Sequence, residues 1–532
     1  MITVSELTHG FDGQTLFKDV NLKFTPGNCY GVIGANGAGK STFLKLLCGI
    51  REVQSGTITM DPNVRMSVLK QDHYAFEEHT VLDTVIMGNE LLYSVMKEKD
   101  ELYMKADFTE EDGFRAAELE AVFAEQDGWE AESNASRLLQ GLGIDQSKLY
   151  SLMADLPEKE KVKVLLAQAL FGNPGVLLLD EPTNGLDLAA TEWLCDFLMD
   201  YEGTVIVVSH DRHFLNTVCT HIVDIDFGQI KMYVGNYEFW YESSQMIQNL
   251  IKNQNKKAEE KIKELENFIA RFSANKSKSK QATSRRKMLE KLRPEELPAS
   301  SRRYPFVGFE QEREVGKDIL TLSDVCFMGG DAVLKGINLS LNKGDKVAIV
   351  TQNDMAGTAL MELLAEVKQP DSGTVKWGVS TSRSYFPKDN SEFFDGVDLS
   401  ILEWMRQYAK DTSETYIRGF MGRMLFSGDE IFKSVSVLSG GERVRCMLSK
   451  MMMGSSNVLL FDQVTNHLDL ESITAVGKGL AAFPGNIIMV SHDYELIQTV
   501  ANRIWAIEPD GTVRDYRCSY EEYVDKKLHG ND

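Results

Sequence analysis

Short apolar runs alternate along the chain with longer segments whose apolar residues recur at helical spacing. Residues 30–33 form an apolar run of strand length, and residues 42–48 after it have the pattern of an amphipathic helix. Further apolar runs end at Asp180 and just before His210. Alternation of this kind is typical of a mostly parallel sheet covered by helices. The pattern therefore predicts an α/β fold.

The same pattern occurs twice. The sequence LLLDEPTNGLD at 177–187 recurs as LLFDQVTNHLD at 459–469, and SHD at 209–211 recurs at 491–493 with the same offset. An upstream match, between QSGT at 54–57 and DSGT at 371–374, has a larger offset. Two homologous units therefore follow each other, and the first contains extra residues between these motifs.

The repeat divides the chain into three parts. We expect a first unit at residues 1–240 and a second unit at 304–532, joined by a linker at 241–303. The extra length of the first unit includes a Glu-rich segment of helical pattern at 81–137, for which we expect a helical arm. In the linker, a long helical pattern is followed by a polar stretch at 273–284 and a shorter helical pattern. The linker therefore predicts an α-helical hairpin.

The bulk composition is that of an ordinary globular protein, with 43% apolar and 26% charged residues. An evenly spread net charge of −22 would repel nucleic acid and anionic membranes. The seven cysteines form no C-x-x-C pair, so neither a zinc site nor a disulfide framework is indicated. The sequence has no signal-peptide pattern and no apolar run near the ~20 residues that span a bilayer. We therefore expect a cytoplasmic protein without a membrane partner.

The charge is uneven, because the linker carries a basic segment at 271–293. This segment has nine Lys or Arg and one acidic residue, a net charge of +8, which leaves −30 for the rest of the chain. A run of charge is most often a solvated spacer, but a basic tip on an acidic body also suits phosphate-rich RNA. The candidate RNA-binding residues are Arg271, Lys276, Lys278, Lys280, Arg285, Arg286 and Lys287.

The strongest chemical motif lies between the first buried strand and its helix. The sequence GANGAGKS at 34–41 fits G-x-x-x-x-G-K-[ST], the phosphate-binding loop. Its glycines let backbone N–H groups converge on one point, and the helix start adds partial positive charge there. Lys40 would contact the β- and γ-phosphates of ATP, and Ser41 would supply a hydroxyl to Mg²⁺. The candidate ATP-binding residues of this segment are Gly34, Ala35, Asn36, Gly37, Ala38, Gly39, Lys40, Ser41 and Thr42.

Further candidates belong to hydrolysis. Asp180 and Glu181 end an apolar strand, where Asp180 would hold Mg²⁺ and Glu181 would orient the attacking water. His210 ends another strand and would contact the γ-phosphate, and Gln71 would touch Mg²⁺ or the water. Simpler roles stay open, with His210 as a helix cap and Gln71 as a loop residue. Phe11 would either stack on adenine or pack in the core.

Together with LSGGE at 438–442, these motifs resemble those of ABC-type ATPases. Two such units in one chain, joined by a basic hairpin and without membrane segments, resemble the ABC-F family of translation factors. The linker sequence ARFSANKSKSKQATSR is similar to that of the YbiT-type subgroup. The resemblance implies two tandem P-loop domains that sandwich ATP, with the signature of one domain completing the phosphate site of the other. The signature residues implied in this role are Ser439, Gly440, Gly441 and Glu442.

The resemblance also implies a partner and a cycle. A monomeric ABC-F protein would close on ATP and Mg²⁺, bind the ribosome near the tRNA exit site, and leave after hydrolysis. Its linker hairpin would reach toward the tRNA and the peptidyl-transferase centre and contact rRNA and tRNA. Three other functions stay open: protection of the ribosome from an antibiotic, non-hydrolytic regulation of the ribosome, and driving a membrane transporter.

The second unit departs from the family pattern. Its phosphate loop reads TQNDMAGT at 351–358, with Gly357 at the position of Lys40 and Asp354 at the position of a glycine. A carboxylate there would repel phosphates, and the loop loses residues that tolerate positive φ. Gln463 replaces the catalytic glutamate, so this position has no carboxylate to act as a base.

The departures are sorted by site. In a head-to-tail sandwich the first loop would face the intact signature of the second unit. The second loop would face the first unit's signature, which reads LPEKE at 156–160, and Lys388 stands there in place of the expected glutamine. We therefore expect one hydrolytic site and one degenerate site. Whether the degenerate site still holds nucleotide is left open by the sequence.

Overall fold

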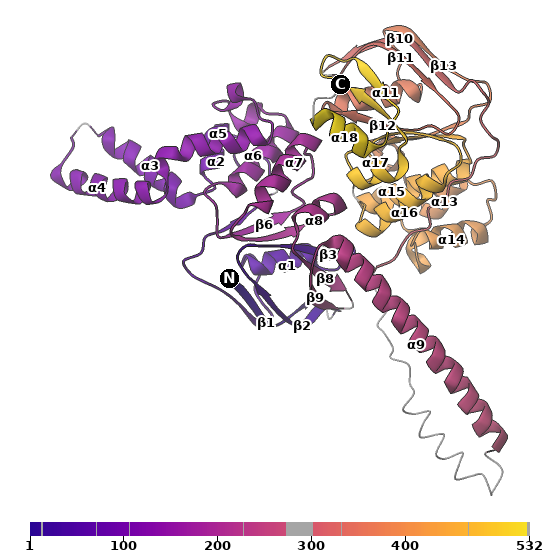
Figure 1. Ribbon diagram of the computed structural model, residues 1–532, viewed down its shortest axis with the longest axis horizontal. Helices are drawn as coiled ribbons and strands as arrows, with labels where there is room; N and C mark the ends of the chain where they lie inside the picture. The colour runs from indigo at the N-terminus through magenta and orange to yellow at the C-terminus, as the bar shows by residue number, and fades with distance from the viewer. Residues whose placement is uncertain are drawn as a thin grey trace.

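The computed structural model shows two α/β units, with one long helix that extends away from both (Figure 1). The structure describes residues 1–11, 14–70, 72–105, 107–226, 228–272, 302–330, 332–466 and 468–528.

The first unit is built on a six-stranded sheet with the order β5-β6-β7-β3-β8-β9. All neighbouring pairs are parallel except β8 and β9. Strand β6 has four consecutive buried apolar residues, as expected for a parallel strand covered on both faces. The strands are β5 (Met66–Val68), β6 (Val176–Asp180), β7 (Thr204–Val208), β3 (Asn28–Gly34), β8 (His221–Asp226) and β9 (Gln229–Val234).

Two hydrophobic cores cover this sheet. One core joins it to α1 (Lys40–Leu47) and to a small antiparallel sheet of β2 (Gln14–Phe24), β1 (Ile2–Phe11) and β4 (Ser55–Met60). The rings of Phe17, Phe24 and Phe43 fill this core. The second core involves the helices α2 (Val81–Ile86), α5 (Ala131–Gly141), α6 (Glu158–Leu170), α7 (Leu188–Met199) and α8 (Arg212–Val218).

The second unit repeats the first. Its main sheet has the order β14-β15-β16-β12-β17-β18, and its small sheet the order β11-β10-β13. The predicted α/β fold with two tandem P-loop domains is therefore confirmed. The strands are β14 (Arg383–Phe386), β15 (Val458–Asp462), β16 (Asn486–Val490), β12 (Lys346–Thr351), β17 (Arg503–Ile507), β18 (Val513–Tyr516), β11 (Ala332–Leu341), β10 (Leu320–Gly329) and β13 (Ser372–Trp377). The helices are α11 (Asp354–Leu364), α12 (Ser391–Phe394), α13 (Ile401–Arg406), α14 (Glu414–Arg423), α15 (Gly440–Gly454), α16 (Leu470–Ala482), α17 (Tyr494–Val500) and α18 (Tyr520–Leu528).

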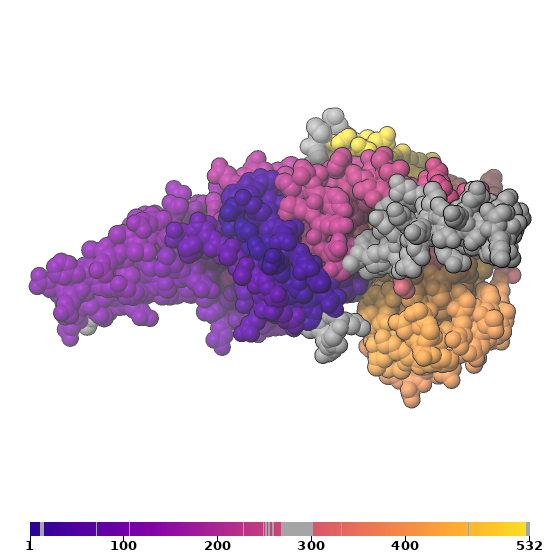
Figure 2. Space-filling model, turned by 90° about the horizontal axis from the view of Figure 1, so that it is seen from below, coloured from indigo at the N-terminus to yellow at the C-terminus, as the bar shows by residue number. Residues whose placement is uncertain are grey.

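Two helices of the segment predicted as an arm project from the first unit. These are α3 (Glu90–Tyr103) and α4 (Glu110–Glu125), which lie side by side at the left of Figure 1 and form the narrow extension in Figure 2. Lys99 on α3 pairs with Glu120 on α4 at 2.9 Å and lies over the ring of Phe123 at 3.7 Å. The pairing of charged and aromatic side chains thus ties the two helices to each other.

The linker begins with α9 (Tyr237–Phe272), a single helix of 36 residues. Arg271 lies in its last turn. The predicted polar turn, the second helix of the hairpin and the other candidate RNA-binding residues lie outside the described residues. The domain boundaries at 240/241 and 303/304 remain predictions.

Candidate functional site

The first phosphate loop, residues 34–41, connects β3 to α1. Gly37 and Gly39 have φ values of 82° and 102°, a left-handed conformation in which glycine is free of strain. Lys40 is buried, and its Nζ donates to the carbonyl oxygens of the first two loop residues at 2.8 and 3.3 Å. The loop therefore has the curled backbone and the lysine at a helix start that a phosphate cradle requires.

A carboxylate and an imidazole lie next to this loop. Glu181 follows the last residue of β6, with a φ of 53°. Its carboxylate accepts from the His210 backbone N–H at 3.2 Å, and His210 Nε2 lies 3.3 Å from the other carboxylate oxygen. Burial raises the pKa of Glu181 to about 8 and lowers the pKa of His210 to about 4. The pair is thus held in a poorly solvated corner of the first unit.

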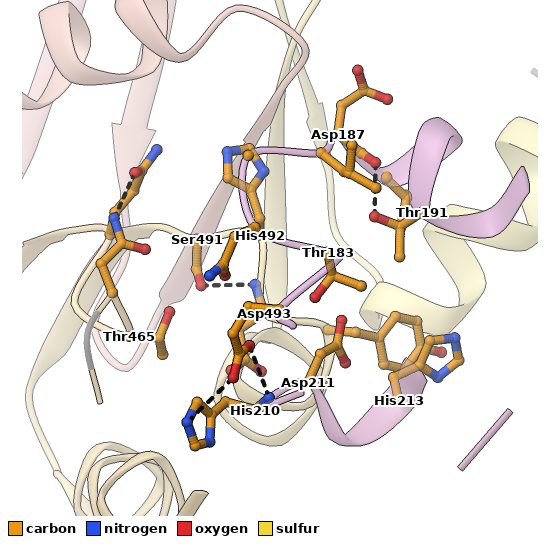
Figure 3. Close-up of a pocket in the computed structure, with 18 of the residues that line it drawn as sticks. Thr183, Asp187, Thr191, His210, Asp211, His213, Thr465, Ser491, His492 and Asp493 are labelled. Carbon is orange, nitrogen blue, oxygen red and sulfur yellow. Dashed lines mark hydrogen bonds and ion pairs between the residues drawn. The ribbon is translucent and has the colours of Figure 1, made fainter. Parts of the chain in front are cut away.

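A cavity of about 1310 Å³ lies between the two units. Lys40, Ser41 and Asp180 are among the first-unit residues that line it. A cavity of this size exceeds what a nucleotide needs. Figure 3 shows first-unit and second-unit side chains on its walls, among them Thr183, Asp187, His210, Thr465, Ser491 and His492.

Charged side chains of each unit lie close to the phosphate-site region of the other unit. Burial lowers the pKa of Lys40, while Glu181 and two second-unit carboxylates, Glu471 and Asp469, act in the opposite direction. The reverse contact also occurs. Burial would raise the pKa of Asp187 in the first unit, but the hydrogen bond from Lys163 and the nearby His492 of the second unit lower it. Each unit therefore presents charged groups to the phosphate site of the other.

The second-unit signature lies apart from the first loop in this structure. Ser439 caps α15, with its backbone N–H and its hydroxyl both donating to Glu442 at 2.7 Å. Ser439 and Gly440 are exposed, and the residues that line the cavity do not include Ser439, Gly440 or Gly441. The structure thus brings together the first loop, Asp180, Glu181 and His210, and leaves the signature on the surface of the second unit.

Two predicted site residues cannot be placed. Gln71 lies outside the described residues, and so does the side chain of Phe11. For Mg²⁺, Ser41 and Asp180 both line the cavity and supply the oxygen ligands that this ion prefers. The first loop with these two residues therefore fits ATP and Mg²⁺.

The second loop, residues 351–358, has a different backbone from the first. Helix α11 begins at Asp354, three positions earlier in the aligned sequence than α1 begins. Asn353 caps it by accepting from the Met355 backbone N–H at 3.0 Å. Because Asp354, Met355 and Ala356 are helical, the aligned positions form no nest of converging N–H groups.

One buried cluster was missed by the sequence prediction. Arg302, at the end of the predicted linker, pairs with Asp224 of the first unit at 2.6 Å and with Glu471 of the second unit at 3.3 Å. Its guanidinium also lies 4.4 Å from the centre of the Trp240 ring, near the start of α9. No motif marks a structural arginine, so only the fold could reveal that it links both units to the base of the linker.

Comparison with known protein families gives matches in both units and in the linker. A family model described as ABC transporter matches residues 17–184 and 334–466, and a second one, also described as ABC transporter, matches 223–308. Within the described residues, no helix has an apolar stretch long enough to cross a membrane.

Several relatives match over nearly the whole chain. The ABC transporter ATP-binding protein YkpA of Bacillus subtilis (strain 168) is 58% identical, with 99% of this chain and 97% of that protein covered. The probable ATP-binding protein YbiT of Escherichia coli O157:H7 is 43% identical, with 99% of each covered. ABC transporter F family member 5 of Arabidopsis thaliana is 30% identical, with 99% and 78% covered.

A solved structure shares the fold. The archaeal ribosome recycling factor aABCE1, in complex with the ribosomal stalk protein aP1, matches with a TM-score of 0.63 and 18% identity, covering 99% of this chain and 92% of that one. With two tandem ABC units, an assembled phosphate loop and these relatives, the chain belongs to the ABC-F family of ABC ATPases, as a YbiT-like member.

Proposed function

We propose that this protein is a monomeric, cytoplasmic ATPase that binds the ribosome near the tRNA exit site while ATP holds its two units closed, and that hydrolysis at one composite site releases it. The observation that carries the proposal is the assembled first site, in which Lys40, Asp180 and Glu181 line one wall of the cavity between the units. The association of aABCE1, a protein of the same fold, with a ribosomal stalk protein supports the choice of partner.

In the first site each group has a defined task. The backbone N–H groups of residues 34–42 and the Lys40 amino group bind the phosphates of ATP. Ser41 and Asp180 hold Mg²⁺, with Gln71 as a further predicted ligand. Mg²⁺ at such a site neutralises the charge that develops on the phosphate oxygens.

Glu181 accepts the proton of the attacking water in this proposal. Burial raises the pKa of its carboxyl to about 8, within about one unit of neutral pH, where a general base combines raised proton affinity with an ionised fraction that can accept a proton. The backbone N–H of His210 fixes one carboxylate oxygen, and the other lies 3.3 Å from His210 Nε2, in a residue that lines the cavity. Neutral His210 then contacts the γ-phosphate through its ring.

Closure completes the site from the second unit. The exposed Ser439 and Gly440 of the signature, with Gly441 and Glu442 behind them, approach the first loop and contact the γ-phosphate. ATP favours the closed form because it binds residues of both units at once, and hydrolysis removes that preference. The closed form presents the linker hairpin, residues 241–303, to the ribosome.

Cosedimentation with ribosomes tests the proposal. The Glu181→Gln variant, which keeps the loop but lacks the base, should pellet with ribosomes in the presence of ATP and remain bound. The wild type should bind only transiently under the same conditions. Because phosphate contacts release counterions, the bound fraction should fall steeply as salt rises. Equal binding of variant and wild type, with or without ATP, would contradict the proposal.

The linker tip needs a matched control. Replacing three tip lysines with glutamine should weaken ribosome binding and flatten its dependence on salt. Replacing three exposed lysines of the first unit should leave both unchanged, although the net charge changes equally. The tip lysines are Lys276, Lys278 and Lys280, and the control lysines are Lys18, Lys23 and Lys45. Equal losses in the two triple variants would exclude a specific role of the tip.

A further inference from the structure

A carboxylate lies in the second phosphate loop where the first loop has a glycine. Asp354 is aligned with Gly37, and its side chain is 8% exposed. His492 Nε2 lies 2.7 Å from one carboxylate oxygen, and Gln463 Nε2 and Lys388 Nζ donate to the other at 3.0 and 3.1 Å. The carboxylate is therefore surrounded by polar and basic groups.

These partners stand at positions that surround the γ-phosphate in the first site as proposed. In the repeat, His492 and Gln463 are aligned with His210 and Glu181, and Lys388 with the predicted glutamine ligand. Side chains that would otherwise face a phosphate thus face an anion that belongs to the chain itself. A carboxylate and a phosphate both accept charge-assisted hydrogen bonds, so one can take the place of the other in such a shell.

A fourth partner comes from the other unit. Lys159, in the first turn of α6, forms an ion pair with Asp354 Oδ2, the oxygen that also accepts from Gln463 and Lys388. In the repeat it is aligned with Gly441, so it belongs to the altered signature of the first unit. Burial alone would raise the pKa of Asp354, but hydrogen bonds from His492, Lys159 and Gln463 hold it well below its usual range. The second loop and the first signature are therefore already joined.

The backbone leaves no cradle for a phosphate at this site. The backbone N–H groups of residues 355–357 donate to the side-chain or carbonyl oxygen of Asn353 instead of converging on an anion. Gly357 stands in place of the loop lysine, and a Cβ there would lie 3.1 Å from Thr351 Cγ2. The site therefore has no lysine to bind a phosphate and little space beside Gly357, and the Asp354 carboxylate repels phosphate.

We propose that Asp354 permanently occupies the second site as a built-in substitute for the γ-phosphate, so that this site takes no nucleotide and joins the two units without ATP. The two sides of the molecule then differ in a simple way. The second loop already contacts the first signature through Lys159, whereas Ser439 and Gly440 of the other signature are exposed. The proposal rests on the proposed function only in assigning ATP to the first site.

The consequence is a clamp with one moving side. The ring of His213 on α8 stacks on Tyr494 of α17 at a centroid distance of 4.1 Å, which adds a further contact between the units. With one side held, a single ATP is enough to close the other side. Fewer degrees of freedom are lost on closure than if two separate units had to be brought together.

Nucleotide stoichiometry tests whether the second site is closed to nucleotide. Equilibrium dialysis of the full chain with Mg²⁺ and the non-hydrolysable analogue AMP-PNP should give about one bound nucleotide per chain, and Lys40→Ala should abolish that binding. A second equivalent in the wild type, or binding that persists in Lys40→Ala, would overturn the proposal.

Hydrogen exchange tests whether Asp354 joins the units. Lys159→Glu places a carboxylate against Asp354, while Lys159→Arg keeps the positive charge, and Lys159 is exposed enough that both variants should fold. Without added nucleotide, the first turns of α6 and α11 should exchange about tenfold faster in Lys159→Glu, and at the wild-type rate in Lys159→Arg. Equal rates in both variants and the wild type would overturn the joining role.

Neither experiment depends on the ribosome. If cosedimentation failed while the stoichiometry and exchange results held, the proposed partner would be wrong and the built-in anion would stand. If AMP-PNP bound at two sites while ribosome binding held, the reverse would be true.

Discussion

The two phosphate loops occupy the same place in the same fold, yet only one of them is curled. In the first loop Gly37 and Gly39 have positive φ and the helix begins at Lys40. In the second loop the helix begins at Asp354, because no glycine is present to interrupt it before Gly357. The strand and helix of a P-loop domain therefore do not by themselves make a phosphate cradle; the glycines and the lysine do.

The residues that follow Asp180 and Asp462 have the same backbone conformation in both units, although their side chains differ. Glu181 and Gln463 both have a φ of 53°. Their backbone N–H groups donate to Val208 and Val490 at 2.8 and 2.9 Å. Since the left-handed turn persists where the carboxylate is lost, it belongs to the backbone path between strand and loop. The difference between the two sites then lies in side chains, which mutations can exchange.

The largest effect is expected at the loop lysine. Lys40→Ala should lower the rate of ATP hydrolysis by about 10³-fold, because it removes the charged donor that binds the phosphates. Lys45→Ala, in the last turn of the same helix and exposed, is the matched control and should hydrolyse ATP at the wild-type rate. Phosphate release under saturating ATP measures both. Turnover that survives in Lys40→Ala would mean that the second site also hydrolyses ATP.

The next effect is expected at the base. Glu181→Gln should reduce turnover by on the order of 10²-fold, with ATP affinity kept, because it removes a proton acceptor and little volume. The reciprocal change, Gln463→Glu, should give no second turnover, because that unit lacks the cradle. Single-turnover kinetics together with nucleotide binding separate the two. A gain of hydrolysis in Gln463→Glu combined with Lys40→Ala would show that the second loop binds ATP after all.

The sequence was sufficient for the fold and for the place of the first loop between its strand and its helix. The repeat, the alternation of strands and helices and the G-x-x-x-x-G-K-[ST] spacing are local patterns, and local patterns determine elements and their order. The carboxylate and imidazole could be assigned to the same site because each ends a strand of a parallel sheet. Lys40, Asp180 and Glu181 accordingly line one cavity wall.

The contacts between the two units could not be predicted from the sequence. Asp354 and Lys159 each looked like the loss of a glycine, and nothing in either motif indicates that they pair across the units. The same holds for Arg302, whose partners Asp224 and Glu471 lie far before it and far after it along the chain. A compensating pair of charges becomes visible only when both partners are placed in space, because each one alone is indistinguishable from decay.

Breaking the buried arginine cluster should change the stability of the folded chain rather than the rate of hydrolysis. Arg302→Ala leaves the buried carboxylates of Asp224 and Glu471 without their cation, at a cost of about 3–5 kcal/mol. Arg302→Lys, which keeps a charge, should cost less, and the exposed Arg517→Ala should cost almost nothing. Urea unfolding followed by fluorescence measures the three. Equal midpoints for Arg302→Ala and Arg517→Ala would show that the cluster does not hold the units together.

The smallest effect concerns pH and again separates the two sites. Burial raises the pKa of Glu181 from its ordinary 4.5 to about 8, so the folded chain binds a proton there that the unfolded chain has already released. Between these two values the stability contributed by this group is therefore lost as pH rises. Glu181→Gln should remove that loss. Between pH 5 and pH 8 the wild type should therefore lose on the order of 1–3 kcal/mol more stability than the variant.

Gln463, at the aligned position, does not titrate, so Gln463→Ala should leave the pH dependence of the unfolding midpoint as it is in the wild type. Parallel pH profiles for Glu181→Gln and the wild type would mean that Glu181 is already ionised at neutral pH, and its proton affinity could then not be what makes it the base.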